Sequence, residues 1–150
     1  MIESKAARLG RVFTLRMEDG DHLPDCLEEF AARNEVKSAL VALIGGAGGG
    51  KLVVGPKDGE AAKIEPLLAK LSGVHEIAAL GTLFPDESGA PRLHMHASAG
   101  RAEAALTGCV RPGVDIWRIA EAVVLEIEES GMVRAVDPRF GFAVLTRSKD

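Results

Sequence analysis

The feature that most constrains the fold of this chain is a nearly unbroken apolar run in its first third. Residues Val36 to Ile44, VKSALVALI, are apolar at almost every position. Such a run is typical of a strand at the centre of a sheet, where elements on both faces cover it. We therefore expect a central strand here, covered on both sides, with the rest of the chain built around it.

Most of the remaining chain also has the patterns of strands. In the first segment, Phe13, Leu15 and Met17 form the apolar side of an alternating pattern. Further along, His75 and Glu76 are adjacent and must therefore point to opposite faces. We expect strands over residues 11 to 17, 74 to 84, 92 to 99, 104 to 109, most of 114 to 128, 132 to 136 and 142 to 146.

One helix is expected between the first strand and the central one. Asp21 can cap it, Pro24 is tolerated in its first turn, and it stops near Asn34. Cys26 falls within its apolar stripe, and we interpret this thiol as a small core residue. The stripe is formed by Leu23, Leu27, Phe30 and Ala31.

One helix and seven or more strands predict an α+β fold. We expect a single compact domain over residues 1 to 150, mostly an antiparallel sheet with one main helix packed on it, and a frayed tail at residues 147 to 150. Residues 57 to 72 allow either a short helix or a strand interrupted by Pro66. The chain shows no apolar run long enough for a membrane span or a signal peptide, so we expect a cytoplasmic protein.

The glycine-rich segment after the central run matches a phosphate-binding loop in part. Gly45 to Lys51 fit the pattern G-x-x-x-x-G-K. Leu52 follows, where that motif needs Ser or Thr, and residues 52 to 54 indicate a strand instead of a helix. We therefore interpret the glycines as positions where the backbone bends or approaches a neighbouring chain closely.

A candidate metal site lies in the segment PRLHMHASAGRAEAALTGC. His94 and His96 are two apart on an expected strand, so they share a face. If Gly100 to Glu103 form a four-residue hairpin loop, Cys109 lies directly opposite His94. Opposed β carbons are roughly 5 Å apart, close enough for one ion to bridge the side chains. The three ligands predict a divalent metal site, zinc first, although two histidines that merely pack are the alternative.

Several segments together resemble one family, the plants-and-prokaryotes-conserved (PPC) domain, which in plants accompanies AT-hooks. They are GRVFTLRMEDGDHLPDCLEEFAARNEVKSALVALIGGAGGGKLVVG, HEIAALGTLF, GAPRLHMHASAG, TGCV and IAEAVVLEI. The resemblance runs from about residue 8 to residue 128. It implies a compact α+β domain that forms a homotrimer, and a metal held by an H-x-H segment and a later G-G-H histidine.

The resemblance assigns some residues directly and leaves others open. His94 and His96 match the H-x-H pair, whereas Cys109 follows Thr-Gly where the family often has Gly-Gly-His. Another alignment sets Cys109 beyond that point and leaves the site one ligand short. Glu76 matches a family glutamate that contacts the ligand or orients a histidine. Arg16 also matches a family position; it pairs with Glu76, reaches a bound anion, or forms a plain surface ion pair.

Three functions are compatible with these features. The first is a homotrimeric DNA-associated regulatory module, but 18 basic against 22 acidic residues give a net charge of −4, and no Arg-Gly-Arg-Pro arm is present. DNA binding would require an assembly that collects basic residues on one face. The alternative is a metal-dependent small-molecule-binding protein or enzyme that uses a site between subunits; a purely structural trimer is the third. The basic residues that the assembly would have to gather for DNA binding are Arg8, Arg11, Arg33, Lys37 and Lys51.

Overall fold

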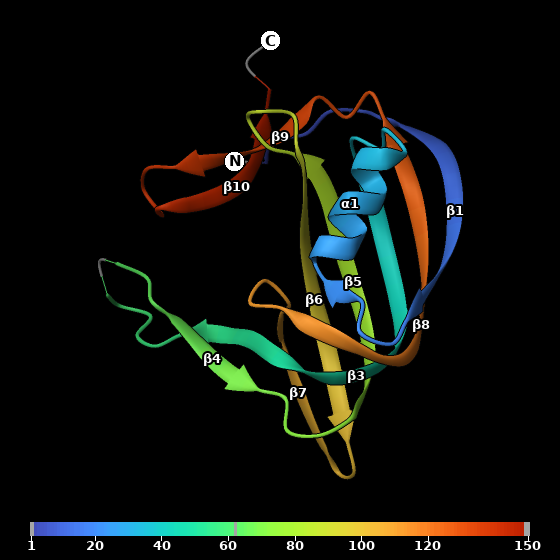
Figure 1. Cartoon of the computed structure of the whole chain (residues 1–150). Helices are drawn as coiled ribbons and strands as arrows, with labels where there is room; N and C mark the ends of the chain where they lie inside the picture. Colours follow the sequence, from blue (N-terminus) through green and yellow to red (C-terminus); the bar gives the residue numbers. More distant parts are fainter. Residues whose placement is uncertain (1, 62, 149–150) are drawn as a thin grey trace.

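A computed structural model describes residues 2–61 and 63–148 and shows a strongly curved antiparallel sheet with one helix on its inner side (Figure 1). The expected α+β class is right in outline, but strands dominate and the helix is short. The elements are β1 (Arg8–Glu18), β2 (His22–Leu23), α1 (Asp25–Arg33), β3 (Ala39–Pro56), β4 (Pro66–Lys70), β5 (His75–Pro85), β6 (Pro91–Arg101), β7 (Ala104–Cys109), β8 (Val114–Glu128), β9 (Met132–Asp137) and β10 (Phe142–Arg147).

The main sheet has the strand order β1-β8-β3-β5-β6-β7. β2 pairs with β8, and β4 pairs with β3, so residues 66 to 70 form the strand that was one of the two alternatives for this region. The two predicted closing strands are present as β9 and β10, and they pair with each other in a separate two-stranded sheet, a pairing that was not predicted. No helix in the described part of the chain is long and apolar enough to cross a membrane.

The predicted central strand is central, because β3 lies between β8 and β5. It is also much longer than expected, since the glycine-rich segment continues the strand to Pro56. A β carbon on Gly45 would lie 2.5 Å from the α carbon of Ala120, so glycine lets β3 and β8 approach closely within one chain. This segment is therefore a strand, and it does not form a phosphate-binding loop.

The far half of β3 closes part of the sheet on itself. Val53 pairs with Cys109 of β7, while the first half of β3 pairs with β5. Strands β3, β5, β6 and β7 thus form a closed circuit. A β carbon on Gly108 would lie 2.4 Å from the carbonyl oxygen of Val53, so only glycine permits this crossing of β3 over β7.

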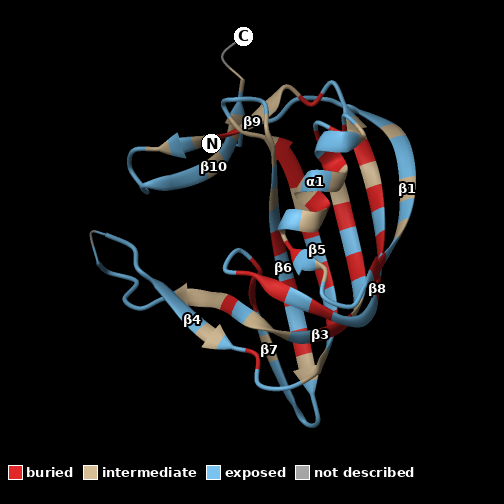
Figure 2. Ribbon diagram, viewed as in Figure 1, coloured by how far each residue is buried: buried red, intermediate tan, exposed pale blue. Residues whose placement is uncertain are grey.

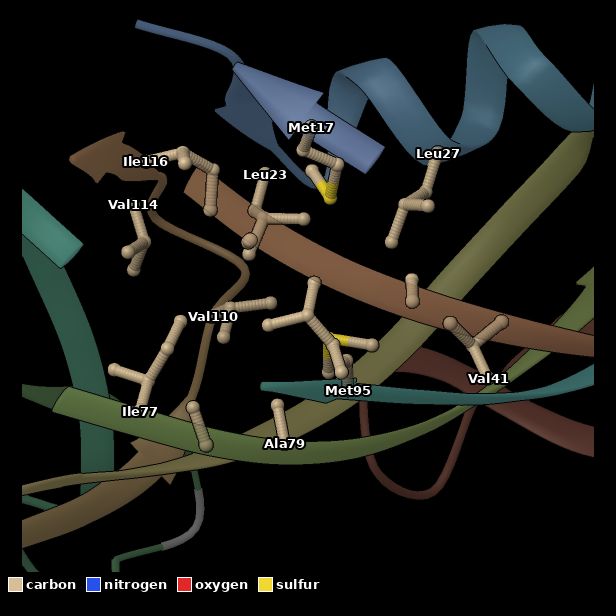
Figure 3. Close-up of a cluster of buried hydrophobic side chains, with 14 of the residues drawn as sticks. Met17, Leu23, Leu27, Val41, Ile77, Ala79, Met95, Val110, Val114 and Ile116 are labelled. Carbon is tan, nitrogen blue, oxygen red and sulfur yellow. The ribbon is translucent and has the colours of Figure 1, made fainter. Parts of the chain in front are cut away.

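The hydrophobic core lies on the inner face of the sheet, under α1 (Figures 2 and 3). Met17 is buried and Phe13 and Leu15 pack against the core, which confirms the predicted apolar side of β1. Cys26 packs against the same core as expected, and burial raises the pKa of its thiol to about 11. Each large side chain buried in this way contributes roughly 1.5–3 kcal/mol. The central members include Leu23, Leu27, Val41, Ile77, Met95, Val110, Val114 and Ile116.

The predicted start of the helix was wrong. The helix begins at Asp25, with Pro24 as its N-cap, and Asp21 instead accepts a hydrogen bond from the backbone N–H of Glu18. Leu23 belongs to β2, where pairing with β8 buries it completely. Long-range strand pairing therefore overrides the local capping signal, because it buries a large side chain that a longer helix would have placed elsewhere. The helix ends at Arg33, next to the predicted stop at Asn34.

The expectation that β3 is covered on both faces was also wrong for this chain. Its outward residue Ile44 is 59% exposed, and Leu80, on the neighbouring strand β5, is 59% exposed as well. The helix and the core cover only the inner face. Of the tail that was expected to fray, Arg147 is paired within β10, and residues 149 and 150 lie outside the described residues.

Candidate metal centre

Three metal-ligating side chains converge on the outward face of the sheet. His94 and His96 project from β6 on either side of Met95, which is fully buried in the core. Their Nε2 atoms are 3.1 Å apart and their rings meet edge to face. Cys109 projects from β7 on the same face, opposite His96. One ligand atom from each of the three residues lies within 4.8 Å of the others.

The register that brings Cys109 to the histidines differs from the prediction. The hairpin loop between β6 and β7 contains only Ala102 and Glu103, so Cys109 lies opposite His96, whereas the prediction placed it opposite His94. The shorter loop requires Ala102 to adopt φ 51°, a left-handed conformation that alanine rarely adopts and that no local pattern predicts. A shift of two residues leaves every side chain on its predicted face, so the cluster survives the error.

The surroundings favour a neutral imidazole at His94. Partial removal of water lowers its pKa, and the nearby charges of Arg134, His96 and Arg111 lower it further. The neutral ring is the form that binds metal ions. Cys109 is only 6% exposed, because β3 crosses beside it at Val53. The ligands line a shallow hollow of about 370 Å³.

The donor set fits zinc. Zinc prefers imidazole nitrogen and thiolate sulfur, and a tetrahedral ion with Zn–N bonds of about 2.0–2.1 Å holds two nitrogens roughly 3.3 Å apart. The separation of 3.1 Å between the histidine Nε2 atoms is close to that value. No carboxylate of the described residues joins the cluster. Two imidazoles and one thiolate leave a fourth position open, which is the arrangement of exchangeable or catalytic sites.

The structure does not bring Arg16 or Glu76 to the cluster. Arg16 lies on β1, with a guanidinium nitrogen 3.4 Å from a carboxylate oxygen of Glu18, and both side chains are exposed. Glu76 lies near the start of β5, four residues before Leu80, which is the β5 residue opposite His96. Four residues along a strand span roughly 13 Å. A role for Arg16 and Glu76 in contacting a ligand stays a prediction.

Two arginines near the cluster were missed from the sequence. Arg111 follows Cys109 by two residues and lines the same hollow as the ligands. Arg134 comes from β9 and donates to the backbone carbonyl and the hydroxyl of Thr82, at 3.0 and 2.9 Å. The nearness of Arg111 could have been read from its position in the chain, but no local pattern connects Arg134 with the histidines.

The model of the Plants and Prokaryotes Conserved (PCC) domain family matches residues 4–128. No curated protein matches the chain in sequence.

Several solved structures share the fold. A metal-containing protein from Archaeoglobus fulgidus is 23% identical, with a TM-score of 0.84 over 98% of this chain and 100% of that chain. A plant- and prokaryote-conserved (PPC) protein from Pyrococcus horikoshii is 22% identical, with a TM-score of 0.83 over 99% and 100%. A protein from Ralstonia eutropha, described as a candidate DNA-binding protein, is 20% identical, with a TM-score of 0.70 over 89% of both chains.

Proposed function

The chain belongs to the Plants and Prokaryotes Conserved domain family, and we propose that it binds a divalent metal ion, zinc first, through His94, His96 and Cys109. The observation that carries this proposal is the convergence of two imidazole nitrogens and one sulfur within 4.8 Å on one face of the sheet. The similar protein from Archaeoglobus fulgidus is described as metal-containing, which supports the same reading.

Three side chains would bind the ion, and a fourth would hold two of them in place. The two imidazoles of His94 and His96 donate through Nε2, and Cys109 donates as a thiolate. Met95, fixed in the core between the histidines, prevents the strand from rotating and so keeps both rings on the outward face. A bound zinc ion would polarise a small molecule or a water at the open position. We therefore propose a metal-dependent small-molecule-binding protein or enzyme.

Elemental analysis of protein purified without an affinity tag tests the metal proposal. We expect about one zinc ion per chain in the wild type, and a loss of most of it in His96→Ala and Cys109→Ser, because each removes one of three ligands. His75→Ala is the matched control, since His75 lies on the same sheet, is not one of the three ligands, and forms a hydrogen bond with the carbonyl of Gly73, at 2.9 Å.

Two results would count against the site. The first is a wild-type protein that takes up no zinc, cobalt or manganese after removal of bound ions and dialysis against each. The second is an equal metal content in Cys109→Ser and His75→Ala, which would show that any bound ion lies elsewhere.

We also propose that the protein is a homotrimer whose outward sheet face is the interface. One row of directly opposed residues crosses four neighbouring strands, and its members therefore share that face. The row consists of Val123, Ala42, Leu80 and His96. Several exposed apolar side chains thus continue directly into the metal ligands. Contiguous apolar surface of this kind typically marks an interaction site. An assembly through this face would place the metal site at the edge of an interface between subunits.

Light scattering tests the assembly. We expect a mass near three chains for the wild type and a lower mass for Leu80→Lys, because a charge in the middle of the apolar face must be desolvated on association. Ala32→Lys adds the same charge on the exposed side of α1 and should leave the mass unchanged. A wild-type mass of one chain at every concentration would remove the proposal.

Association with DNA is a second candidate function. It is supported by the similar protein from Ralstonia eutropha that is described as a candidate DNA-binding protein. The surface charges give it little help, because Arg8, Arg11 and Arg33 are each paired with a glutamate at 2.6 to 2.7 Å. A mobility shift of duplex DNA that weakens steeply with salt would support this function, and no shift at low salt would contradict it.

A further inference from the structure

Arg134 carries a buried positive charge that has no ion pair among the described residues. Its side chain comes from β9 and is 8% exposed, with the guanidinium carbon 5.8 Å from the centre of the Phe84 ring. It donates hydrogen bonds to the backbone carbonyls of Thr82 and Arg92 and to the hydroxyl of Thr82. None of the ion pairs among the described residues includes it. Neutral acceptors satisfy N–H groups but leave the charge, and a buried charge without a counterion is costly.

This guanidinium faces a hollow of about 710 Å³ between α1, the loop after β5, and the β9–β10 hairpin. The volume is in the range of sites for small molecules. Four acidic side chains also line it. Arg92 lies 3.3 Å from the carboxylate of Glu28 and 2.9 Å from that of Asp86, whereas Asp25 and Glu87 are exposed, so that water screens their charges. Arg111 lines the hollow too, and no ion pair among the described residues includes it. Arg111 and Arg134 are therefore the arginines of the lining that have no carboxylate partner among the described residues.

The hollow adjoins the metal centre. His94 and Arg111 line both this hollow and the smaller one that contains His96 and Cys109. A molecule bound beside Arg111 would therefore lie next to the ligand cluster.

We propose that the hollow binds a small molecule with an oxyanion group, a carboxylate or a phosphate, which Arg111 and Arg134 hold. A second donor atom of the same molecule takes the open position at the metal. The planar guanidinium matches carboxylate and phosphate oxygens in pairs, which makes arginine the suitable residue for this task. The inference rests on the proposed metal site for one end of the ligand, and the arginine end stands independently.

The hairpin has a defined part in this arrangement. Strands β9 and β10 follow residue 128, where the match to the family model ends. β9 contacts β5, and a parallel bridge joins Asp86 to Arg134, which holds the hairpin against the end of the main sheet (Figure 1). The hairpin thus contributes a wall of the hollow and one of the two charges that would recognise the ligand.

Isothermal titration calorimetry on the full chain tests the inference. Malonate and inorganic phosphate are titrated separately into metal-free and zinc-loaded protein. We expect one of them to bind the metal-free wild type, about 10-fold weaker binding in Arg111→Gln, and no change in Arg33→Gln. Arg33→Gln is the matched control because it removes the same charge from the far end of α1. The probe that binds more tightly identifies the oxyanion class, and zinc should tighten the binding of malonate.

A second variant distinguishes a loss of anion binding from a loss of folding. Arg134→Lys keeps the charge but loses the paired geometry, so we expect several-fold weaker binding with an unchanged circular dichroism spectrum. The inference is overturned if neither probe binds metal-free protein at about 10 mM, a weak limit for small anions, or if Arg111→Gln and Arg33→Gln bind alike.

The metal content of the same samples separates this inference from the proposed function. Binding of an anion without uptake of zinc supports the arginine pocket and refutes the metal centre. Uptake of zinc without binding of either anion refutes the pocket and leaves the metal centre in place.

Discussion

The two faces of the main sheet consist of alternate residues of the same strands, yet one face forms the core and the other carries the candidate binding site. On the inner face, Met95 is fully buried beneath α1, while its neighbours His94 and His96 are exposed on the outer face. The inner face has a helix and a core to cover it, whereas the outer face has apolar side chains that no described residue covers. The comparison shows that the residues that stabilise the chain and those available for binding are separated by one position along a strand.

Removing a core side chain between the two histidines should give the largest effect. We expect Met95→Ala to lower the free energy of unfolding by about 2–5 kcal/mol, because it leaves a cavity in a closely packed region. His96→Ala in metal-free protein should cost under about 1 kcal/mol, since that side chain is exposed. Urea denaturation of both variants measures the difference. Equal losses of unfolding free energy would show that the two faces do not differ in their contribution to stability.

The crossing of β3 over β7 should be nearly as sensitive. A β carbon at position 108 would lie 2.4 Å from the carbonyl oxygen of Val53, so Gly108→Ala must separate the strands beside Cys109. We expect a loss of about 1–3 kcal/mol in urea denaturation and weaker zinc binding. Gly59→Ala is the control, because nothing lies within 4 Å of a β carbon there. A Gly108→Ala protein with wild-type stability would mean that the strands do not meet in this way.

The turn between β5 and β6, which contains Asp86, should make the stability of the chain depend on pH. Hydrogen bonds from the Ser88 hydroxyl and from Arg92 lower the pKa of Asp86 to about 2. A lowered pKa means stability that is present above the usual value of about 4 and is lost as the pH falls towards 2.

The substitution Asp86→Asn tests this effect. We expect it to cost about 1 kcal/mol at pH 7, after allowance for screening by solvent. Thermal unfolding should show the gap between wild type and variant closing between pH 4 and pH 2. A gap that stays constant over this range would assign the loss to shape alone, not to charge.

The smallest effect on the single chain is expected on the outer face. Leu80 and Leu83 lie on the same strand, one 59% and the other 1% exposed. Leu83→Ala should cost about 2–5 kcal/mol, whereas Leu80→Ala should change stability by under about 0.5 kcal/mol in dilute protein. If the chains associate through this face, the cost of Leu80→Ala should grow with protein concentration, and a series of melting curves would show it.

Much of the fold was predictable because it depends on local alternation. The apolar side of β1, the opposite directions of His75 and Glu76, and the presence of two closing strands all follow from a period of two along a strand. The start of α1 was not predictable in this way, since Leu23 is held by pairing with Val114, far along the chain. The length of β3 was missed for a similar reason: its glycines are explained only by the nearness of β8.

The sequence by itself determined which face each candidate ligand occupies, because parity along a strand is unchanged by a register error of two residues. His94, His96 and Cys109 therefore meet although the predicted loop was wrong. Only the tertiary structure decided what surrounds them. The β9–β10 hairpin packs against the end of the sheet and so brings the buried charge of Arg134 near His94. Contacts between segments so far apart in the chain leave no periodic pattern in the sequence.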